Sequence, residues 1–288
     1  MSDGAGASAG GRIYQLALSR KAKVAVGLDW GIPSSERVVN SALCAKRDGY
    51  AEPVLVSSRR ETSPHFSEVI GDELPLIVDD EPEAVLVDLL KGGAVDAAVR
   101  GNLGSRTLIP LLRSEFRKKN LCRVTLLEIS GRVVMLAPVG IEEGDSAKDL
   151  LSIAQNCLKL SSSLHIGYKI AVISGGRLED KGRSPRVDRM LRSSESLVEM
   201  LRGLNFCAEN YGVELERAIE GDATLVLAPD GITGNLIFRS LVLVSNVESF
   251  GACATALPKP YVDTSRAKGS YLLPIILASA LKAAAEGK

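Results

Sequence analysis

The sequence has few of the features that mark disulfide-bonded, metal-binding or nucleic-acid-binding proteins. Its five cysteines are scattered over 288 residues without a CxxC pair, so neither a disulfide framework nor a cysteine zinc site is indicated. Its 35 basic residues are balanced by 35 acidic ones, and a chain without net charge has no general attraction for nucleic acid or an anionic membrane. We therefore expect a cytoplasmic protein in a reducing compartment that binds a small molecule or another protein.

Long apolar segments are also missing. The apolar stretch near the C-terminus, residues 271–285, contains Pro274 and Lys282 and is too short to cross a bilayer, so we expect a packed amphipathic helix. The first residues are small and polar and lack the basic and apolar regions of a signal peptide. We interpret residues 1–22 as a disordered tail.

Patterns for common cofactors are absent from the sequence as well. No group of His, Cys, Asp and Glu has the spacing of a metal site, so we expect no metal. No GxGxxG fingerprint is present, which leaves a nicotinamide site and the common Rossmann-type site for S-adenosylmethionine without support. No cofactor is evident from the residues alone.

Short apolar runs rich in β-branched residues alternate with helical patterns along the chain. This alternation predicts an α/β fold whose mainly parallel sheet is covered by helices on both faces. Two of the runs are separated only by Ser130-Gly131-Arg132, which is too short for a crossover helix, so they should form an antiparallel hairpin in a mixed sheet. The expected strands are residues 24–28, 53–57, 74–78, 95–99, 124–129, 133–139, 170–173 and 224–228.

The segment from residue 221 to residue 239 is the most informative part of the chain. An apolar strand runs into a turn at Asp230, and Gly234 and Asn235 then open an apolar helical run. The free N–H groups at the start of a helix attract a phosphate or carboxylate. Asp230 and Asn235 also suit helix capping, and capping is compatible with ligand binding.

A second turn follows the predicted strand at residues 95–99. Arg100 should emerge at the carboxyl end of this strand, where open α/β sheets bind ligands, with Gly101 and Asn102 beside it. A fixed guanidinium group suits a phosphate or carboxylate. An exposed arginine after an ordinary tight turn explains the same residues equally well.

A third turn follows the strand at residues 170–173 and carries several arginines. Three arginines at a spacing of three, from Arg183 to Arg189, would lie along one helix face and could meet a polyanionic ligand. Because Asp188 lies among them, a salt-bridged surface is the alternative for Arg189. The anion-binding candidates in this turn are Ser174, Gly175, Arg177 and Arg183.

Several of these segments occur in the order found in a known superfamily. Residues 228–239 and 260–266 resemble the two C-terminal motifs of the phosphate acetyl- and butyryltransferases. Most of residues 24–285 is more similar still to a methanogen branch of that superfamily, the methanogenesis marker protein 4 family, also named "putative methyltransferase subunit X". The segments that carry this resemblance are Val99-Arg-Gly-Asn-Leu-Gly104, Leu136-Ala-Pro-Val-Gly-Ile141, residues 173–183, Pro185-Arg-Val-Asp-Arg189 and Asp263-Thr-Ser-Arg-Ala-Lys268.

The resemblance implies a two-domain, three-layer α/β/α fold with mainly parallel mixed sheets, like that of the phosphate acyltransferases and of isocitrate and isopropylmalate dehydrogenases. It implies a first domain at residues 23–140 plus 248–288 and a second at 141–247, with a ligand in the cleft between them. A polar, glycine-bearing break at residues 141–146 before a helix expected at 147–160 supports the first boundary. The resemblance also implies a homodimer that pairs through the middle domain.

The resemblance assigns the catalytic positions to Ser265 and Arg266, with Asp263 beside them. In the superfamily the matching serine steadies a thiolate leaving group and the matching arginine binds phosphate, so CoA or another phosphate-bearing cofactor is implied. Two positions depart from the family pattern. Ala267 stands where a glycine is usual, and Leu272 stands near the place of the catalytic aspartate, whose loss would slow proton removal by about 10²–10⁴-fold.

Three functions follow from these features. The first is a transferase of methanogen one-carbon or coenzyme metabolism that serves as a methyltransferase subunit or accessory factor and binds a small anionic ligand. The second is a phosphate acyltransferase that acts on an acyl-CoA and orthophosphate, which the Ser265–Arg266 pair supports and Leu272 opposes. The third is a non-catalytic ligand-binding or assembly factor that keeps the pocket without the base.

Overall fold

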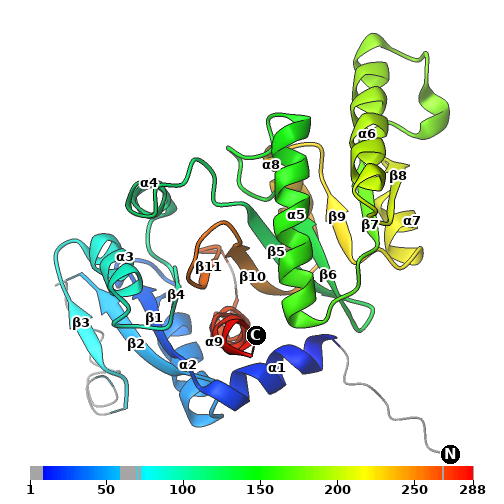
Figure 1. The fold of residues 1–288 in the computed structure, drawn as a ribbon. Coiled ribbons are helices and arrows are strands. Elements are labelled where there is room, and N and C mark those ends of the chain that lie inside the picture. The colour runs from blue at the N-terminus through cyan, green and yellow to red at the C-terminus, as the bar shows by residue number, and fades with distance from the viewer. Residues whose placement is uncertain (1–8, 59–69, 71–72, 268, 288) are drawn as a thin grey trace, which may run out of the picture. The chain divides into compact units, whose positions relative to one another are not determined.

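The computed structural model describes residues 9–58, 70, 73–267 and 269–287. Its internal contacts divide the chain into two compact units, and Figure 1 shows both in chain order from blue to red. Unit 1 comprises Met1–Leu121 and Phe250–Lys288, and unit 2 comprises Cys122–Ser249.

The sheet of unit 1 has the strand order β3-β2-β1-β4-β11-β10. Neighbouring strands in it are parallel except β10, which pairs with β11 in the antiparallel sense. The carboxyl ends of β1, β4 and β11 therefore meet at one edge. The strands are β1 (Lys23–Leu28), β2 (Glu52–Ser57), β3 (Leu76–Val78), β4 (Ala97–Val99), β10 (Glu248–Ala254) and β11 (Tyr261–Asp263).

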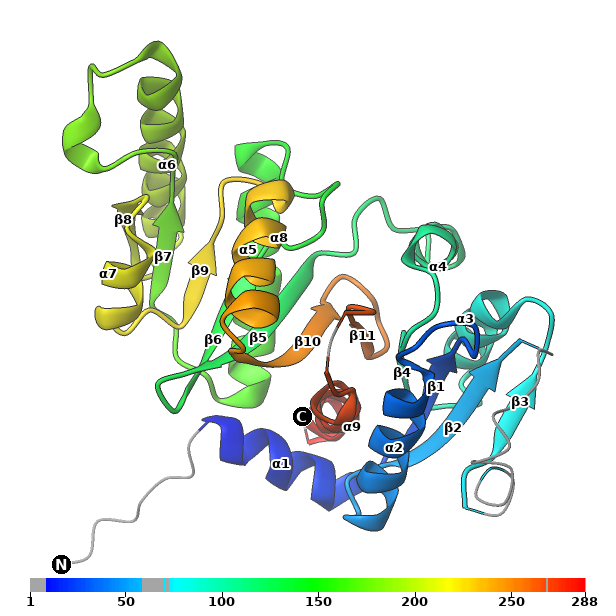
Figure 2. The same cartoon turned by 180° about the vertical axis from the view of Figure 1, so that it is seen from behind.

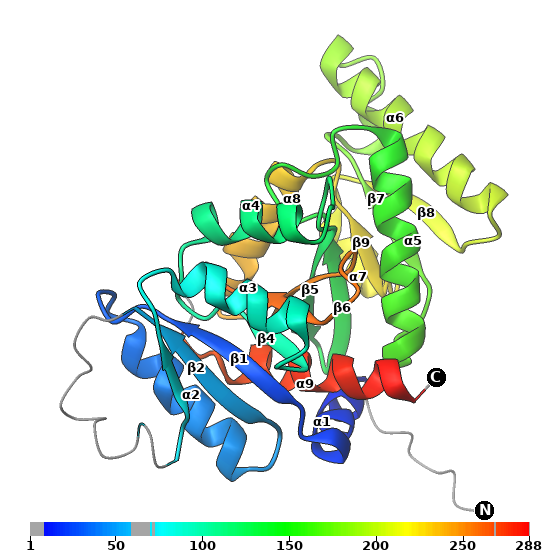
Figure 3. The same cartoon turned by 60° about the vertical axis from the view of Figure 1, so that its left-hand side comes forward.

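Helices cover both faces of this sheet. Helices α2 and α9 pack on one face, with α1 against α9, and α3 packs on the other face beside α4 (Figure 3). This is the three-layer arrangement that the alternation of runs predicts. The helices are α1 (Ala9–Arg20), α2 (Ser35–Arg47), α3 (Pro82–Gly92), α4 (Ser105–Glu115) and α9 (Leu272–Glu286).

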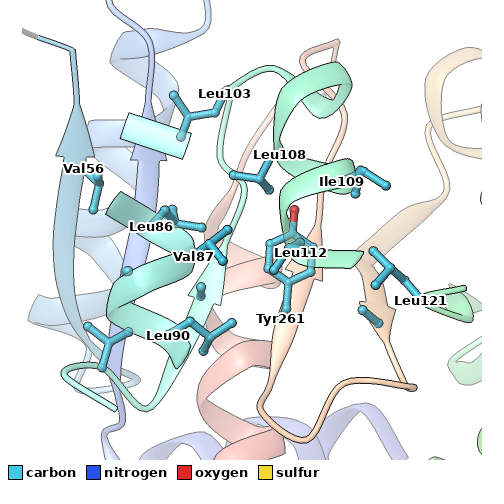
Figure 4. Packing of buried hydrophobic residues seen from close by; sticks show 14 residues of the cluster. Val56, Leu86, Val87, Leu90, Leu103, Leu108, Ile109, Leu112, Leu121 and Tyr261 are labelled. Carbon is cyan, nitrogen blue, oxygen red and sulfur yellow. The ribbon is translucent and has the colours of Figure 1, made fainter. Parts of the chain in front are cut away.

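A cluster of buried apolar side chains joins α3 and α4 to the sheet of unit 1. Leu86 and Leu90 of α3 and Leu108 and Leu112 of α4 are fully buried and gather around Tyr261 of β11 (Figure 4). Burial of a leucine side chain contributes about 1.5–3 kcal/mol. This packing fixes the strand ends that carry the polar residues of unit 1.

Helix α1 corrects the expectation that residues 1–22 form a disordered tail. Residues 1–8 lie outside the described residues, but Ala9–Arg20 is a helix. Ile13 and Ala17 lie four residues apart and are fully buried, which is the spacing of a helix face. The Tyr14 ring lies 5.7 Å from that of Tyr50 and 6.0 Å from that of Phe250, measured between centroids, so this segment has a packing surface of its own.

The sheet of unit 2 has the strand order β5-β6-β9-β7-β8. Strands β5 and β6 form the predicted antiparallel hairpin, and the pairs β6–β9, β9–β7 and β7–β8 are parallel. The carboxyl ends of β6, β9 and β7 therefore lie along one edge. The strands are β5 (Arg123–Ile129), β6 (Arg132–Ala137), β7 (Ile170–Ile173), β8 (Ala208–Gly212) and β9 (Leu225–Leu227).

Helices α5 and α6 cover one face of the unit 2 sheet and α8 covers the other (Figures 1 and 2). A short 3₁₀ turn, η2, precedes α6, and a π-helical segment, η3, continues α8. The helical elements are α5 (Ala147–Leu164), η2 (Leu178–Asp180), α6 (Pro185–Gly203), α7 (Leu215–Glu220), α8 (Gly231–Phe238) and η3 (Arg239–Val244).

The observed boundaries differ from the expected ones at residues 140 and 248. The division falls between Leu121 and Cys122 and between Ser249 and Phe250, so the β5–β6 hairpin belongs to unit 2. The reason is strand pairing, because β6 is hydrogen-bonded to β9 with Met135 opposite Leu225. The polar break at residues 141–146 is a connection within unit 2.

The fold class agrees with the expectation. Both units are α/β with mainly parallel strands and one antiparallel pair each, and helices lie on both faces. In the part of the chain that the structure describes, no helix combines the length and the apolar character needed to cross a membrane.

Candidate functional site

The carboxyl edge of the unit 1 sheet brings five of the predicted site residues together. Arg100 and Asn102 follow β4, and Ser265 and Arg266 follow β11, the strand beside β4. Asp263 is the last residue of β11 itself. Residues about 160 positions apart in sequence thus share one loop cluster because their strands are parallel neighbours.

Arg100 and Asp263 form a buried ion pair at this edge. Their side chains are 8% and 12% exposed, and Arg100 Nε lies 2.5 Å from Asp263 Oδ1. Arg100 Nη1 also donates to the carbonyl of Leu103 at 3.0 Å. Burial opposes the charge of Arg100, but the nearby Asp263 carboxylate raises the pKa of the guanidinium above its ordinary value. The pair joins the loop after β4 to the end of β11.

Asn102 connects the β4 loop to the loop after β1. Its side-chain oxygen accepts from the Asp29 amide at 2.7 Å, and its Nδ2 donates to the Asp29 carbonyl at 2.9 Å. The same Nδ2 lies 3.3 Å from Ser34 Oγ. The buried amide of Asn102 thus satisfies polar groups of the protein itself.

The ends of β1 and β4 lie so close together that the residue after Arg100 must be glycine. Gly101 has φ +61°, and a Cβ placed on it would lie 1.8 Å from the carbonyl oxygen of Gly27. Thr264 Oγ1 also donates to the Gly101 carbonyl. The first contact brings the ends of β1 and β4 together, and the second joins the loops after β4 and β11.

The Arg266 loop, residues 263–267, presents the most accessible cation of this cluster. Arg266 is exposed, and its Nε donates to the Asn102 carbonyl at 2.9 Å, which fixes the direction of the guanidinium. Its Nη2 lies 3.4 Å from the position that a Cβ on Gly104 would occupy. Gly104 is the N-cap of α4 and provides no capping side chain, so N–H groups of the first turn of α4 are available beside Arg266.

Two neighbours complete the surroundings of the Arg266 loop. Glu83 Oε1 accepts from the Gly104 amide at 3.2 Å and places one carboxylate near the site. Ser265 is half-buried, and its Oγ accepts from the Ala267 amide at 3.3 Å. The hydroxyl proton of Ser265 can therefore be donated to a ligand. Leu272 is the first residue of α9, so the position expected for an acid holds an apolar side chain.

Sequence reasoning missed two polar groups at the same edge. Ser57 ends β2 and is fully buried, and Trp30 follows β1. Among the described residues, Ser57 Oγ and Trp30 Nε1 have no hydrogen-bond partner although both atoms are buried. The rule that polar residues after predicted strands form the site would have found both, because each lies at the end of a predicted apolar run.

The carboxyl edge of the unit 2 sheet holds the remaining candidates in a second cluster. Ser174, Gly175 and Arg177 follow β7, whereas Asp230 follows β9, the neighbouring strand. Arg183 lies farther along the connection to α6. Because α6 begins at Pro185, Arg183 precedes the helix and does not share a helix face with Arg186 and Arg189, contrary to the expectation from their spacing.

Helix α8 begins three residues earlier than expected. Asp230 is its N-cap and accepts from the Thr233 amide at 2.7 Å, so Gly234 and Asn235 lie within the helix. A Cβ on Gly234 would lie 1.9 Å from the Pro138 carbonyl oxygen, and Asn235 Nδ2 donates to the Val139 carbonyl at 3.0 Å. Both residues therefore hold α8 against the end of β6.

The turn after β7 is closed by its own hydrogen bonds. Ser174 is 4% exposed, and its Oγ lies 3.4 Å from the Gly176 carbonyl. A Cβ on Gly175 would lie 2.3 Å from Met190 Sδ, so the glycine lets α6 approach. The Arg177 amide and the Arg183 guanidinium both bond Asp180 and hold the pKa of that carboxyl below its ordinary value. The side chain of Arg177 is exposed.

A buried acid in unit 2 was not found from the sequence. Glu143 is 1% exposed; its Oε2 accepts from the Arg123 amide at 2.8 Å and its Oε1 lies 3.3 Å from Arg123 Nε. Burial raises the pKa of Glu143, although Arg123 acts in the opposite direction. The Glu143 carbonyl also accepts from the Gly231 amide at 2.8 Å, which positions the start of α8. Glu143 is thus a structural acid of this edge.

The side chains at these two edges determine which class of ligand each edge suits. Within the described ranges, no cluster of three or more His, Cys, Asp and Glu side chains could hold a metal ion. Among the candidate residues, the exposed cationic side chains are Arg266 at the unit 1 edge and Arg177 and Arg183 at the unit 2 edge, where the exposed carboxylate of Glu179 lies in the same turn. The chemistry of both edges therefore favours an anion.

Comparison with known proteins identifies sequences that are similar to this chain. No family model matches it. It is 35% identical over 266 residues to a Methanosarcina barkeri protein named "Putative methyltransferase mtx subunit X", with 92% of this chain and 95% of that protein covered. It is 36% identical over 262 residues to a protein of the same name from Methanosarcina acetivorans, with 91% and 90% covered.

Solved structures show the same fold at low sequence identity. A phosphotransacetylase from Streptococcus pyogenes superposes with a TM-score of 0.68 at 20% identity and covers 96% of this chain and 97% of its own. A branched-chain phosphotransacylase from Enterococcus faecalis gives a TM-score of 0.66 at 16% identity, with 91% and 98% covered. The fold is therefore that of the phosphate acyltransferases. By sequence, the chain belongs to the family of the methanogen proteins named "Putative methyltransferase mtx subunit X".

Proposed function

We propose that this chain is a transferase-family protein that serves as a subunit or accessory factor of a methyltransferase in methanogen one-carbon or coenzyme metabolism. We propose further that it binds a phosphate- or carboxylate-bearing ligand at the Arg266 loop. The names of the methanosarcinal relatives support the first statement. The geometry of the loop supports the second.

The observation that carries the ligand proposal is the position of Arg266 beside the start of α4. The guanidinium and the N-terminal end of a helix are both positive, and their proximity is unfavourable unless an anion lies between them. Glu83 balances part of this charge through its bond to Gly104. In the described chain no carboxylate forms an ion pair with Arg266, so its terminal nitrogens are available to a ligand.

A thermal-shift panel tests this proposal. The probes are orthophosphate, CoA, acetyl-CoA and S-adenosylmethionine, each added to the wild type, to Arg266→Ala and to Arg113→Ala. Arg113 lies in the last turn of α4, at the end of the helix away from Gly104, and is the matched control. A ligand at about 100 times its Kd stabilises the folded chain by about 2.7 kcal/mol, which raises Tm by several degrees.

The panel separates the components of the proposal. Stabilisation of the wild type and of Arg113→Ala but not of Arg266→Ala supports the ligand site and identifies the ligand class. Equal stabilisation of all three proteins places the ligand elsewhere. If no probe stabilises the wild type, the ligand proposal fails, and co-purification with a methyltransferase becomes the test of the accessory role.

Phosphate acyl transfer is the second candidate function. Ser265 and Arg266 lie side by side at the edge of the unit 1 sheet, and the fold is shared with phosphotransacetylases. Leu272 opposes this function, because a carboxylate that could take a proton from the thiol is missing from that position. Release of thiol from acetyl-CoA in the presence of orthophosphate measures this activity directly. A rate that depends on Ser265 and Arg266 would favour acyl transfer, whereas binding without release favours the accessory role.

The homodimer, the ligand cleft between the domains and the cytoplasmic location stay predictions. Light scattering during gel filtration measures the first. A mass of twice 30.6 kDa is expected, and a monomer at micromolar concentration would contradict the prediction.

A further inference from the structure

Unit 2 contains a cavity beside its sheet edge, and the candidate residue Asp230 is part of its lining. The cavity has a volume of about 680 Å³ and lies between the first turns of α5 and the middle of α6, against the ends of β7 and β9. Volumes of about 300–1,000 Å³ are typical of small-molecule sites. No residue of the Arg266 loop lines the cavity, since every lining residue belongs to unit 2.

The inner wall of the cavity is apolar. It consists of strand residues and of helix side chains that face the sheet, and several of them are buried. A wall of this kind accommodates the aliphatic or aromatic body of a ligand. The residues include Leu150 of α5, Val172 of β7, Met190 and Leu197 of α6, and Pro229 after β9.

The outer wall of the cavity carries two arginines of α6. Arg189 and Arg192 are three positions apart on α6, so their side chains lie on the same face of the helix, and both line the cavity. Asp188, the acid closest in sequence, accepts instead from the Gly182 amide at 2.7 Å. No carboxylate of the described chain forms an ion pair with Arg189 or Arg192. The described residues therefore do not form the salt-bridged surface considered for Arg189.

The remaining polar side chains of the wall are four serines and two aspartates, and three of the serine hydroxyls, those of Ser146, Ser193 and Ser194, donate to groups of the protein itself. Ser193 and Ser196 of α6 are exposed hydroxyls on the wall, and Ser146 caps α5 by accepting from the Asp149 amide. Two carboxylates also line the cavity. Asp230 is engaged as the N-cap of α8, and Asp145 is exposed before α5. The first turn of α5 is capped by Ser146 and carries the Asp149 carboxylate, so the two arginines provide the groups that are free to bind an anion.

We propose that this cavity is a second ligand site, which binds a molecule with a phosphate or phosphoanhydride group on a largely apolar or aromatic body. Arg189 and Arg192 bind the anionic group, and the inner wall between β7 and α6 holds the body. A planar guanidinium group binds phosphate through two hydrogen bonds, which a surface lysine does not reproduce. The proposal stands independently of the function proposed for the Arg266 loop.

Isothermal titration calorimetry with ADP as the probe tests this site. ADP joins a diphosphate to an aromatic body, and pyrophosphate and adenosine are titrated separately as the two halves. The variants are the double substitution Arg189→Ala with Arg192→Ala, and Ser196→Trp, which fills the mouth with an exposed side chain. Arg186→Ala is the matched control, because Arg186 is an exposed arginine of α6 that does not line the cavity.

The expected result is that ADP binds more tightly than either half and that both cavity variants weaken ADP binding at least tenfold. Arg186→Ala and Arg266→Ala should bind ADP like the wild type, which separates this site from the Arg266 loop. Unchanged binding in both cavity variants would overturn the proposal. A folded wild-type protein that does not bind ADP would also overturn it. An equal loss of ADP affinity in Arg186→Ala would overturn it too, because that loss would reflect the net charge of α6 and not the cavity. Unfolding curves of each variant show that it is folded.

Discussion

At the scale of single residues, burial divides the charged groups of unit 1 into two kinds. Arg100 and Asp263 are buried and paired with each other, so their charges connect two loops of the protein. Arg266 is exposed and directed by one hydrogen bond to a backbone carbonyl. A ligand can replace water around Arg266 without breaking an internal ion pair, and this difference is the reason that the proposed function rests on Arg266.

Breaking the buried pair should destabilise the chain strongly. Asp263→Asn or Arg100→Met leaves one charge buried without its partner, and we expect a loss of about 3–5 kcal/mol in the free energy of unfolding. The double variant Arg100→Met with Asp263→Leu buries no charge and should lose less than either single variant. Urea unfolding followed by circular dichroism measures all three. Single variants that unfold like the wild type would show that the pair does not hold the two loops together.

Glu143 should make stability depend on pH in a defined direction. Burial raises the pKa of Glu143 above the value of an unfolded glutamate, so the folded chain keeps this proton to a higher pH than the unfolded chain does. The contribution of Glu143 to stability is therefore greatest below the ordinary pKa of glutamate and decreases as pH rises through the raised pKa. Glu143→Gln lacks this titration and keeps an acceptor for the Arg123 amide.

The measurement is the free energy of unfolding of the wild type and of Glu143→Gln at several values from about pH 4 to about pH 7. The stability of the variant relative to the wild type should rise with pH. A difference that stays constant would show that Glu143 titrates alike in the folded and unfolded chains. A difference that falls would show that the Arg123 pair lowers the pKa instead.

At the scale of elements, the sequence was informative where apolar runs were long and uniform. The hairpin of β5 and β6 follows from its two runs and three-residue turn, and α5 and α9 follow from their helical patterns. Strand β8 was missed, because its central residues are polar and are exposed or only partly buried. Strand β11 is three residues long, which is too short for a pattern, and its hydrogen bonds to β4 decide its structure.

The sequence also failed to predict helix α1, and the packing of this helix leads to a test. Glycine, alanine and serine dominate the sequence before it, and the helix is stabilised by burial rather than by a strong local preference. Ile13→Ala should therefore cost about 2–5 kcal/mol in the free energy of unfolding. Leu18→Ala, on the same helix at 45% exposure, should change it by about 0.5 kcal/mol or less. Equal effects in chemical denaturation would contradict the packing of α1.

Two helical glycines make a matched test of the contact between α8 and the loop after β6. A Cβ on Gly231 would lie 1.6 Å from the Gly140 carbonyl oxygen, whereas nothing lies within 4 Å of one on Gly203. Gly231→Ala should cost at least about 1–3 kcal/mol, because backbone must move. Gly203→Ala should be neutral or stabilise by about 0.5–1 kcal/mol. Thermal unfolding of the two variants checks the order, and a stable Gly231→Ala protein would show that α8 does not contact this carbonyl.

At the scale of the whole molecule, the fold and the family could be predicted from the sequence more completely than the site could. The order of the separated segments carries the family, and the alternation of runs carries the α/β class. Neither pattern shows whether an arginine side chain is buried in an ion pair with a carboxylate of the protein or is exposed to solvent. Arg100 and Arg266 both follow strands and both suit anions, and only their packing separates them. The unit boundary was misplaced for the same reason, because strand pairing between β6 and β9 is not visible in the local sequence.

The affinity for orthophosphate tests the central claim most directly. Calorimetric titration of the wild type should show binding at the Arg266 loop, and Arg266→Ala should weaken it at least about tenfold, the loss expected for one charge-assisted hydrogen bond. Arg113→Ala should bind like the wild type. If Arg266→Ala binds orthophosphate as tightly as the wild type does, or if the folded wild type binds none, the Arg266 loop is not the anion site that this account proposes.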